Sequence, residues 1–85
     1  TENKEQLVVY PNPAEQYVVV SSAYSVNTMS LINVLGQKQN CSISQYSLHN
    51  TYNYKLNTEN LPSGIYFIKA TDSNGNQLNG KFVKQ

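Results

Sequence analysis

The alternation of apolar and polar side chains is strongest in residues 61–72, which read Leu-Pro-Ser-Gly-Ile-Tyr-Phe-Ile-Lys-Ala-Thr-Asp. Successive side chains of a β-strand point to opposite faces, so Tyr66, Ile68 and Ala70 fall together on one face of such a strand. This pattern predicts the central strand of the fold, with these three side chains on its buried face.

Turn-forming residues bound this strand on both sides. Pro62 fixes its own φ and Gly64 tolerates a positive φ, so together they predict a turn at the start of the strand. After the strand, the pair Asn74-Gly75 is the strongest sequence signal for a two-residue hairpin turn. Residues 77–84 then return beside the first strand, so the C-terminal part of the chain is predicted to be a β-hairpin.

Five further segments carry strand patterns. Pro11 and Pro13 end the first, because each proline removes a backbone donor and biases the residue before it to extended geometry. Residues 45–50 are predicted as a loop, and no segment has helical periodicity. About seven short strands with turn signals between them predict an all-β, antiparallel two-sheet sandwich. The five segments are residues 7–10, residues 17–22, a strand through Met29, Leu31 and Asn33, the weakly patterned residues 37–44 as its edge hairpin partner, and residues 51–56.

The length of 85 residues allows one domain, which buries about 60% of the surface of its unfolded chain and needs most of its apolar side chains for one core. Residues 1–6 are polar and are predicted as the end of a linker from an upstream part of the protein, with the domain at residues 7–85. Six lysines, no arginine and five carboxylates form no basic cluster, so we expect no nucleic-acid partner. No apolar run approaches the roughly 20 residues that span a bilayer, and no secretory signal is visible, so we expect any export signal for the inner membrane to lie elsewhere.

Candidate catalytic and metal-binding residues are few. A Ser/His/Asp hydrolase needs a base with an orienting carboxylate, and His49, the only histidine, is predicted in a polar loop without a partner. A pair of Cys41 with His49 is imaginable, but one histidine and one cysteine fall short of the ligands that zinc takes. Glu15, Glu59 and Asp72 are isolated carboxylates with no predicted cleft to perturb them. The sequence therefore predicts no enzymatic activity, no metal and no cofactor.

Two groups of side chains are candidates for binding. Ile65 and Phe67 lie opposite Tyr66 and Ile68 on the central strand, so they are exposed if only one face is covered, and we predict a possible docking surface there. Exposed tyrosines can stack on sugars, and Tyr17, Tyr24 and Tyr46 are the candidates for that use. The alternative is that most tyrosines only fill volume in the core.

Three groups of residues together carry a family resemblance. Tyr10-Pro-Asn-Pro-Ala14 lies near the start, a strand that ends in Gly36 follows, and Leu61-Pro-Ser-Gly-Ile-Tyr-Phe-Ile-Lys69 precedes a terminal hairpin that finishes in Lys81-Phe-Val-Lys84. This order and spacing resembles the C-terminal sorting domain, type A, of cargo proteins of the type IX secretion system, the Por system of Bacteroidetes. The resemblance covers residues 7–85.

The resemblance implies an Ig-like, seven-stranded sandwich without catalysis of its own, at the C-terminus of a secreted enzyme or adhesin. Such domains are recognised in the periplasm by the type IX outer-membrane translocon and its shuttle proteins, and they cross the outer membrane with their cargo. A surface sortase of the gingipain-like cysteine peptidase class then usually removes them, so that the cargo stays on the cell surface or is released. By resemblance, the cut is expected at or before residues 1–6.

The motif residues carried over to this chain each have a structural reading beside the functional one. Glycines and prolines shape turns, and Tyr66 is expected in the core, so we expect recognition to depend on a smaller exposed subset, chiefly the C-terminal lysines. One departure is Asn33-Val-Leu before Gly36, where relatives often carry an acidic or polar stretch, which leaves the role of that turn open. The carried-over residues are Tyr10, Pro11, Asn12, Pro13, Gly36, Leu61, Gly64, Tyr66, Lys81 and Lys84.

The alternative function is a fibronectin-like or carbohydrate-binding accessory module of a secreted protein. An accessory module can sit anywhere in its parent and stays in the mature product, whereas a sorting domain comes last and is usually removed. Whether Gln85 is the natural C-terminus distinguishes the two.

Overall fold

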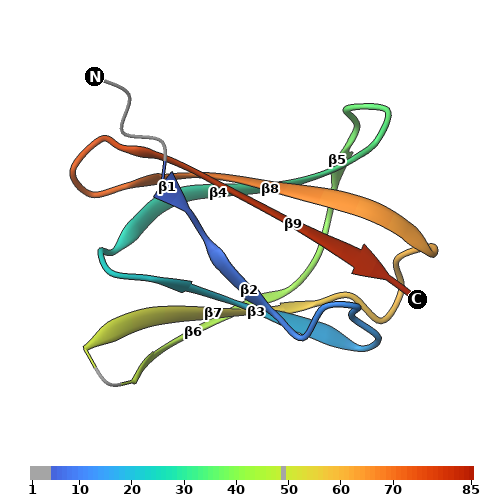
Figure 1. Ribbon diagram of the computed structural model, residues 1–85, viewed down its shortest axis with the longest axis horizontal. Coiled ribbons are helices and arrows are strands. Elements are labelled where there is room, and N and C mark those ends of the chain that lie inside the picture. The colour runs from blue at the N-terminus through green and yellow to red at the C-terminus, as the bar shows by residue number, and fades with distance from the viewer. Residues whose placement is uncertain (1–4, 49) are drawn as a thin grey trace.

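Two β-sheets lie face to face in the computed structural model, which describes residues 5–48 and 50–85 (Figure 1). One sheet has the strand order β1-β9-β8-β4-β5 and the other the order β2-β3-β7-β6. This arrangement confirms the predicted all-β, Ig-like two-sheet sandwich. The strands are β1 (Glu5–Gln6), β2 (Val8–Tyr10), β3 (Tyr17–Ser22), β4 (Val26–Asn33), β5 (Lys38–Gln39), β6 (Ile43–Leu48), β7 (Thr51–Asn57), β8 (Gly64–Asp72) and β9 (Gln77–Lys84).

The strand count differs from the predicted seven because the described part of the chain contains nine. The two strands without a predicted counterpart are β1, whose two residues are too few to show an alternating pattern, and β6, most of which was predicted as a loop. Strand β1 pairs with β9 in parallel, the exception to an otherwise antiparallel pairing of the described strands. Glu5 and Gln6, predicted as the end of a linker, therefore belong to the sheet, while residues 1–4 of that segment lie outside the described residues.

The C-terminal hairpin forms as predicted, but its turn differs from the expected two-residue form. Strands β8 and β9 pair from Gly64 opposite Lys84 to Thr71 opposite Gln77. Between them, the Gly75 amide donates to the Asp72 carbonyl, and the Asp72 amide donates to the Asn76 carbonyl. Gly75 has a φ of 84°, in the left-handed region. The loop between Asp72 and Asn76 is therefore a three-residue turn, a type that favours glycine at its third position.

Residues 37–50 are where the predicted elements need most correction. Strand β5 does pair with β4 as an edge hairpin, through Ile32 opposite Lys38, but this pairing includes only Lys38–Gln39. The chain then crosses to the other sheet, where β6 takes up most of the segment predicted as a loop and pairs with β7. The described side chains of β6 are all exposed, so no buried face imposes an alternating pattern on this edge strand. His49 lies outside the described residues.

The core lies between the inner faces of the two sheets. Tyr66, Ile68 and Ala70 are buried there, as the alternation of the central strand predicts. The Tyr66 ring stacks on that of Phe82, with 5.6 Å between ring centroids. Burying a side chain of this size contributes about 1.5–3 kcal/mol, so this contact fixes the start of β8 against the end of β9. The other core side chains include Leu7, Ala14, Val18, Val20, Leu31, Tyr54, Leu56 and Leu78.

Candidate functional site

The N-terminal Tyr-Pro-Asn-Pro segment is hydrogen-bonded to the last strand. The Asn12 side-chain oxygen accepts a bond from the Val83 amide at 3.0 Å, although the two residues are 71 positions apart. The Ala14 amide donates to the Val83 carbonyl at 2.7 Å, and the Gln85 amide donates to the Ala14 carbonyl at 2.8 Å. The beginning and the end of the domain are thus joined at one end of the sandwich, on the side where the C-terminus lies in Figure 1.

The Leu-Pro-Ser-Gly turn before β8 meets the same end of the last strand. The Lys84 ammonium donates to the Leu61 carbonyl at 2.9 Å, and the Tyr66 hydroxyl donates to the Pro62 carbonyl at 2.6 Å. Gly64 has a φ of 151°, a conformation that residues with a side chain rarely adopt. We call residues 10–14, 61–66 and 81–85 together the motif corner, because three motifs distant in sequence are packed into one structure there.

Thr58 links Leu61 of the motif corner to the segment that precedes β3, and sequence reasoning missed this residue. Its side chain is fully buried, its amide donates to the Gln16 carbonyl at 2.9 Å, and its hydroxyl donates to the Glu15 carbonyl at 3.3 Å. Its own carbonyl accepts from the Leu61 amide at 3.0 Å. Because the hydroxyl's partner is 43 residues away, no local pattern marks Thr58 in the sequence.

Gly36 belongs to the family motif but lies outside the motif corner and takes no part in its hydrogen bonds. It has a φ of 82° in the turn between β4 and β5, and the Asn33 side-chain oxygen accepts from the amides of Leu35 and Gln37, each at 3.0 Å. Asn33 therefore shapes this turn, which is a physical role for the departure seen in the sequence. The turn lies at the same end of the five-stranded sheet as the motif corner, since Asn33 pairs with Tyr66.

The two C-terminal lysines lie on opposite faces of β9. Lys81 is exposed, whereas Lys84 is 8% exposed, so the expectation that both lysines are exposed is wrong for Lys84. Alternation explains the difference, because Lys84 shares the inward face with Phe82. Its aliphatic stem covers the end of the core while its ammonium reaches the Leu61 carbonyl.

Other motif residues stay accessible. Tyr10, Pro11 and Pro13 are exposed, and the peptide bonds Tyr10–Pro11 and Asn12–Pro13 are both cis. Asn12 is exposed as a residue, but its oxygen is occupied by the Val83 amide. A partner at this corner therefore meets a tyrosine ring and two proline rings.

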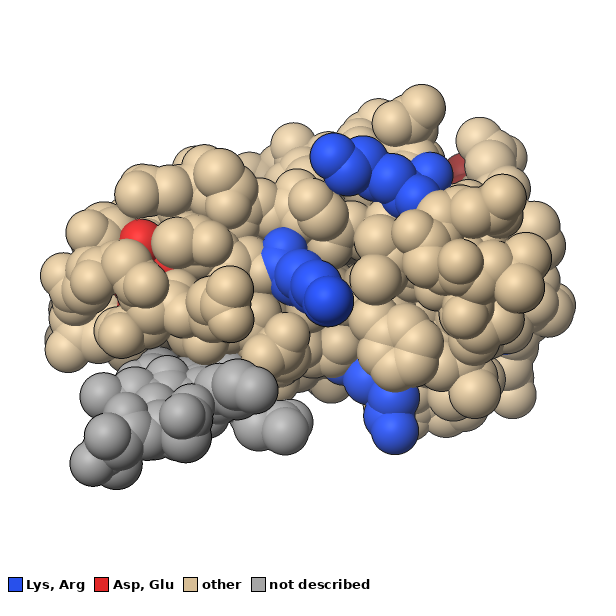
Figure 2. Space-filling view, turned by 90° about the horizontal axis from the view of Figure 1, so that it is seen from above, with Lys and Arg blue, Asp and Glu red and all other residues tan. Residues whose placement is uncertain are grey.

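Ile65 and Phe67 point away from the core, as their position on the central strand predicts. Ile65 is exposed beside Val83, whereas Phe67 is half-buried between Ile32 and Lys81. Both lie on the outer face of the five-stranded sheet, the face seen from above in Figure 2. That they dock a partner stays a prediction.

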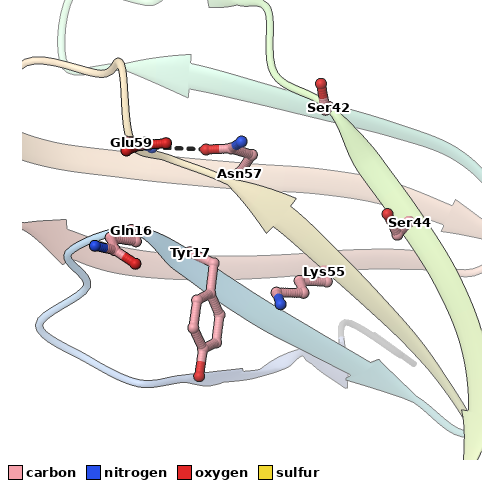
Figure 3. Close-up of a pocket in the computed structure, with 7 residues that line it drawn as sticks. All are labelled: Gln16, Tyr17, Ser42, Ser44, Lys55, Asn57 and Glu59. Atoms are coloured by element: carbon pink, nitrogen blue, oxygen red, sulfur yellow. Dashed lines mark hydrogen bonds between the residues drawn. The ribbon is translucent and has the colours of Figure 1, made fainter.

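A shallow hollow of about 300 Å³ lies on the outer face of the four-stranded sheet, where Tyr17 is a candidate for sugar stacking (Figure 3). The Lys55 ammonium lies 4.5 Å from the centroid of the Tyr17 ring and covers one side of it. Tyr46 is exposed on β6, while Tyr24 lies in the connection between β3 and β4. The three tyrosines thus come from separate elements and do not follow one another along a strand.

The reactive groups of the domain also have defined surroundings. Cys41 is half-buried, and burial raises the pKa of its thiol, which disfavours the reactive thiolate. Burial alone would raise the pKa of the Asp72 carboxyl, but hydrogen bonds from Asn76, Asn74 and Gly75 outweigh it and hold that pKa below its ordinary value. Asp72 therefore stabilises the hairpin turn. Within residues 5–48 and 50–85, no three His, Cys, Asp or Glu side chains are grouped as metal ligands, and no helix is long and apolar enough to cross a membrane.

Comparison with known proteins identifies the family. A family model described as a secretion system C-terminal sorting domain matches residues 8–85, which include the whole motif corner. No curated protein matches the chain. The chain therefore belongs to the family of C-terminal sorting domains that serve as the signal for type IX secretion.

Proposed function

We propose that this domain is a folded sorting signal that the type IX outer-membrane translocon and its shuttle proteins recognise in the periplasm. The cargo ahead of the domain crosses the outer membrane with it and then stays at the cell surface or is released. The observation that carries this proposal is the motif corner, because its residues come together only when the chain is folded. The domain contributes recognition and no catalysis.

The hydrogen bonds divide the motif residues into two groups. Asn12, Tyr66 and Lys84 use their polar atoms within the domain, so their role is to build the corner. The exposed members are left for contact with the machinery. We propose that this contact uses Tyr10, Pro11, Pro13 and Lys81.

The pairing of β1 supports a position for the sortase cut. A cysteine peptidase needs an extended, accessible segment, and the peptide bonds of Glu5 and Gln6 lie in a strand paired with Leu78 and Asn79. We therefore propose that a surface sortase of the gingipain-like class cuts ahead of Glu5. The folded domain then leaves as one piece.

The test is a reporter enzyme fused ahead of the chain and produced in a bacterium with a type IX system. We expect the reporter on the cell surface, and mass spectrometry of its C-terminus should show that the chain has been removed ahead of Glu5. A strain without the translocon should keep the reporter inside the envelope. A reporter that reaches the surface in that strain, with the whole chain still attached, would favour the accessory module instead.

A further inference from the structure

The outer face of the five-stranded sheet carries lysines and no carboxylate among its described side chains. Alternation along β4, β5, β8 and β9 assigns its members, and Figure 2 shows lysine side chains spread along this face with little acidic surface. No lysine in the described part of the chain forms an ion pair with a carboxylate. We call this surface the basic face, and it consists of Thr28, Ser30, Ile32, Lys38, Ile65, Phe67, Lys69, Thr71, Gln77, Asn79, Lys81 and Val83.

Half of the basic face, next to the motif corner, is apolar. Ile65 and Val83 lie opposite each other on β8 and β9 and are 42% and 41% exposed. In the next row of the sheet, Ile32 lies opposite Phe67, with Lys81 on the other side of Phe67. An apolar strip with a charged rim is typical of a surface that another protein covers.

The other half of the basic face is a polar hollow of about 200 Å³ around Lys69. Hydroxyl and amide groups surround this lysine, and none of these side chains has a hydrogen-bond partner within residues 5–48 and 50–85. An ammonium among unpaired donors is an arrangement that a carboxylate satisfies with charge-assisted hydrogen bonds. The polar side chains that line the hollow are Thr28, Ser30, Lys69, Thr71, Gln77 and Asn79.

We propose that the basic face docks an acidic protein surface of the secretion machinery, with a carboxylate at Lys69 and an apolar side chain against Ile65, Phe67 and Val83. This inference rests on the proposed function, because it names the chemistry of the partner that reads the folded domain. Charge complementarity assigns the sign of that partner, since the face offers lysines alone.

A membrane surface fits the basic face less well. Binding to anionic lipids typically needs about four to eight clustered lysines or arginines, and this face has Lys38, Lys69 and Lys81. Its one aromatic side chain, Phe67, is half-buried and therefore offers little apolar surface for insertion between lipids. A protein with an acidic surface is therefore the occupant.

The first test compares export of a reporter fused to variants of the chain. We expect Lys69→Glu and Phe67→Ser each to lower the amount of surface reporter about tenfold or more, because a like charge or a lost apolar contact at a docking surface weakens binding strongly. Lys69→Arg keeps the charge and should export normally. Lys55→Glu, the same change on the outer face of the other sheet, is the matched control and should also export normally.

The second test identifies the chemistry of the partner. A zero-length carbodiimide, added to envelopes of the secreting strain, joins a lysine amine to a carboxylate that touches it. We expect mass spectrometry to find Lys69 linked to an aspartate or glutamate of an envelope protein, and the link to be absent in Lys69→Arg, which still exports. Thermal unfolding of each variant shows whether it folds. If Lys69→Glu or Phe67→Ser does not fold, the carbodiimide experiment alone decides whether Lys69 contacts a carboxylate.

The outcomes separate the inference from the proposed function. Failure of the unaltered chain to export its reporter counts against the proposed function. Normal export by folded Lys69→Glu and Phe67→Ser overturns only the inference. A carbodiimide cross-link to an envelope protein through other lysines and not through Lys69 also overturns only the inference. Binding of the chain to vesicles of phosphatidylglycerol and phosphatidylethanolamine, lost in Lys69→Glu, would assign the face to a membrane and also overturn it.

Discussion

The Lys84 ammonium donates a hydrogen bond to the Leu61 carbonyl at 2.9 Å, across 23 residues of sequence. This bond connects the end of the last strand to the turn that begins the central strand. A basic residue near the C-terminus thus holds the domain together and is not available as an exposed charge. Several residues of the family motif therefore serve to hold the two ends of the fold together.

Replacing Lys84 with methionine should destabilise the domain. Lys84→Met keeps most of the aliphatic stem but removes the donor to the Leu61 carbonyl, so we expect the free energy of unfolding to fall by about 1–3 kcal/mol. Urea unfolding followed by circular dichroism measures this. Lys81→Met changes an exposed lysine of the same strand and should stay within about 0.5 kcal/mol of the parent. Equal effects of the two substitutions would refute the role given to Lys84.

Removing one hydroxyl tests the turn before β8. Tyr66→Phe loses the bond to the Pro62 carbonyl while the ring can stay stacked on Phe82, so we expect a loss of about 1 kcal/mol in the free energy of unfolding. The control is Tyr46→Phe, because Tyr46 is exposed and its hydroxyl has no partner among the described residues. If Tyr66→Phe unfolds at the same urea concentration as the parent, this hydrogen bond does not stabilise the turn.

A methyl group at Gly64 tests backbone strain separately from packing. A Cβ added there meets no atom within 4 Å, but the φ of 151° is one that alanine rarely adopts. Gly64→Ala should therefore lower the free energy of unfolding by about 1–3 kcal/mol through strain alone. Ser63→Ala, at the exposed neighbouring position, should have little effect in the same thermal unfolding experiment. A Gly64→Ala melting curve that overlays the parent's would argue against the strained turn.

The hairpin turn should make stability depend on acidic pH. Because the folded pKa of Asp72 lies below its ordinary value of 3.8, the carboxylate contributes stability that is fully present above that value. This contribution is lost as the pH falls from near 4 through the folded pKa. Melting temperatures from pH 7 to pH 2 should decline less in Asp72→Asn than in the parent across that acidic range. A decline of the same size in both proteins would show that the Asp72 carboxylate does not stabilise the turn.

The sequence predicts the C-terminal hairpin because its signals are local. Alternating side chains in β8 and a turn with Gly75 lie within one short stretch, and the structure agrees. The pattern also correctly assigns Ile65 to the outer face. The exact form of the turn could not be predicted from the Asn-Gly pair, because it depends on the hydrogen bonds that the Asp72 carboxylate accepts from the Asn74 and Asn76 amides.

The parts that sequence reasoning missed depend on distant partners. None of the described side chains of strand β6 is buried, and its pairing with β7 is what defines it as a strand. Thr58 and Asn12 bond to backbone groups 43 and 71 residues away, so neither neighbourhood shows what these residues do. Lys84 looks like a surface charge in the sequence because the carbonyl that accepts its bond lies in another turn.

The most direct measurement concerns the end of the last strand, which both completes the fold and carries Lys81. A reporter fused to the chain without residues 81–85 loses the bond from Lys84 to Leu61 and the bond from Val83 to Asn12 together. If the folded corner is what the secretion machinery recognises, protease treatment of intact cells should find this reporter still inside the envelope. Surface display equal to that of the complete chain would contradict the account.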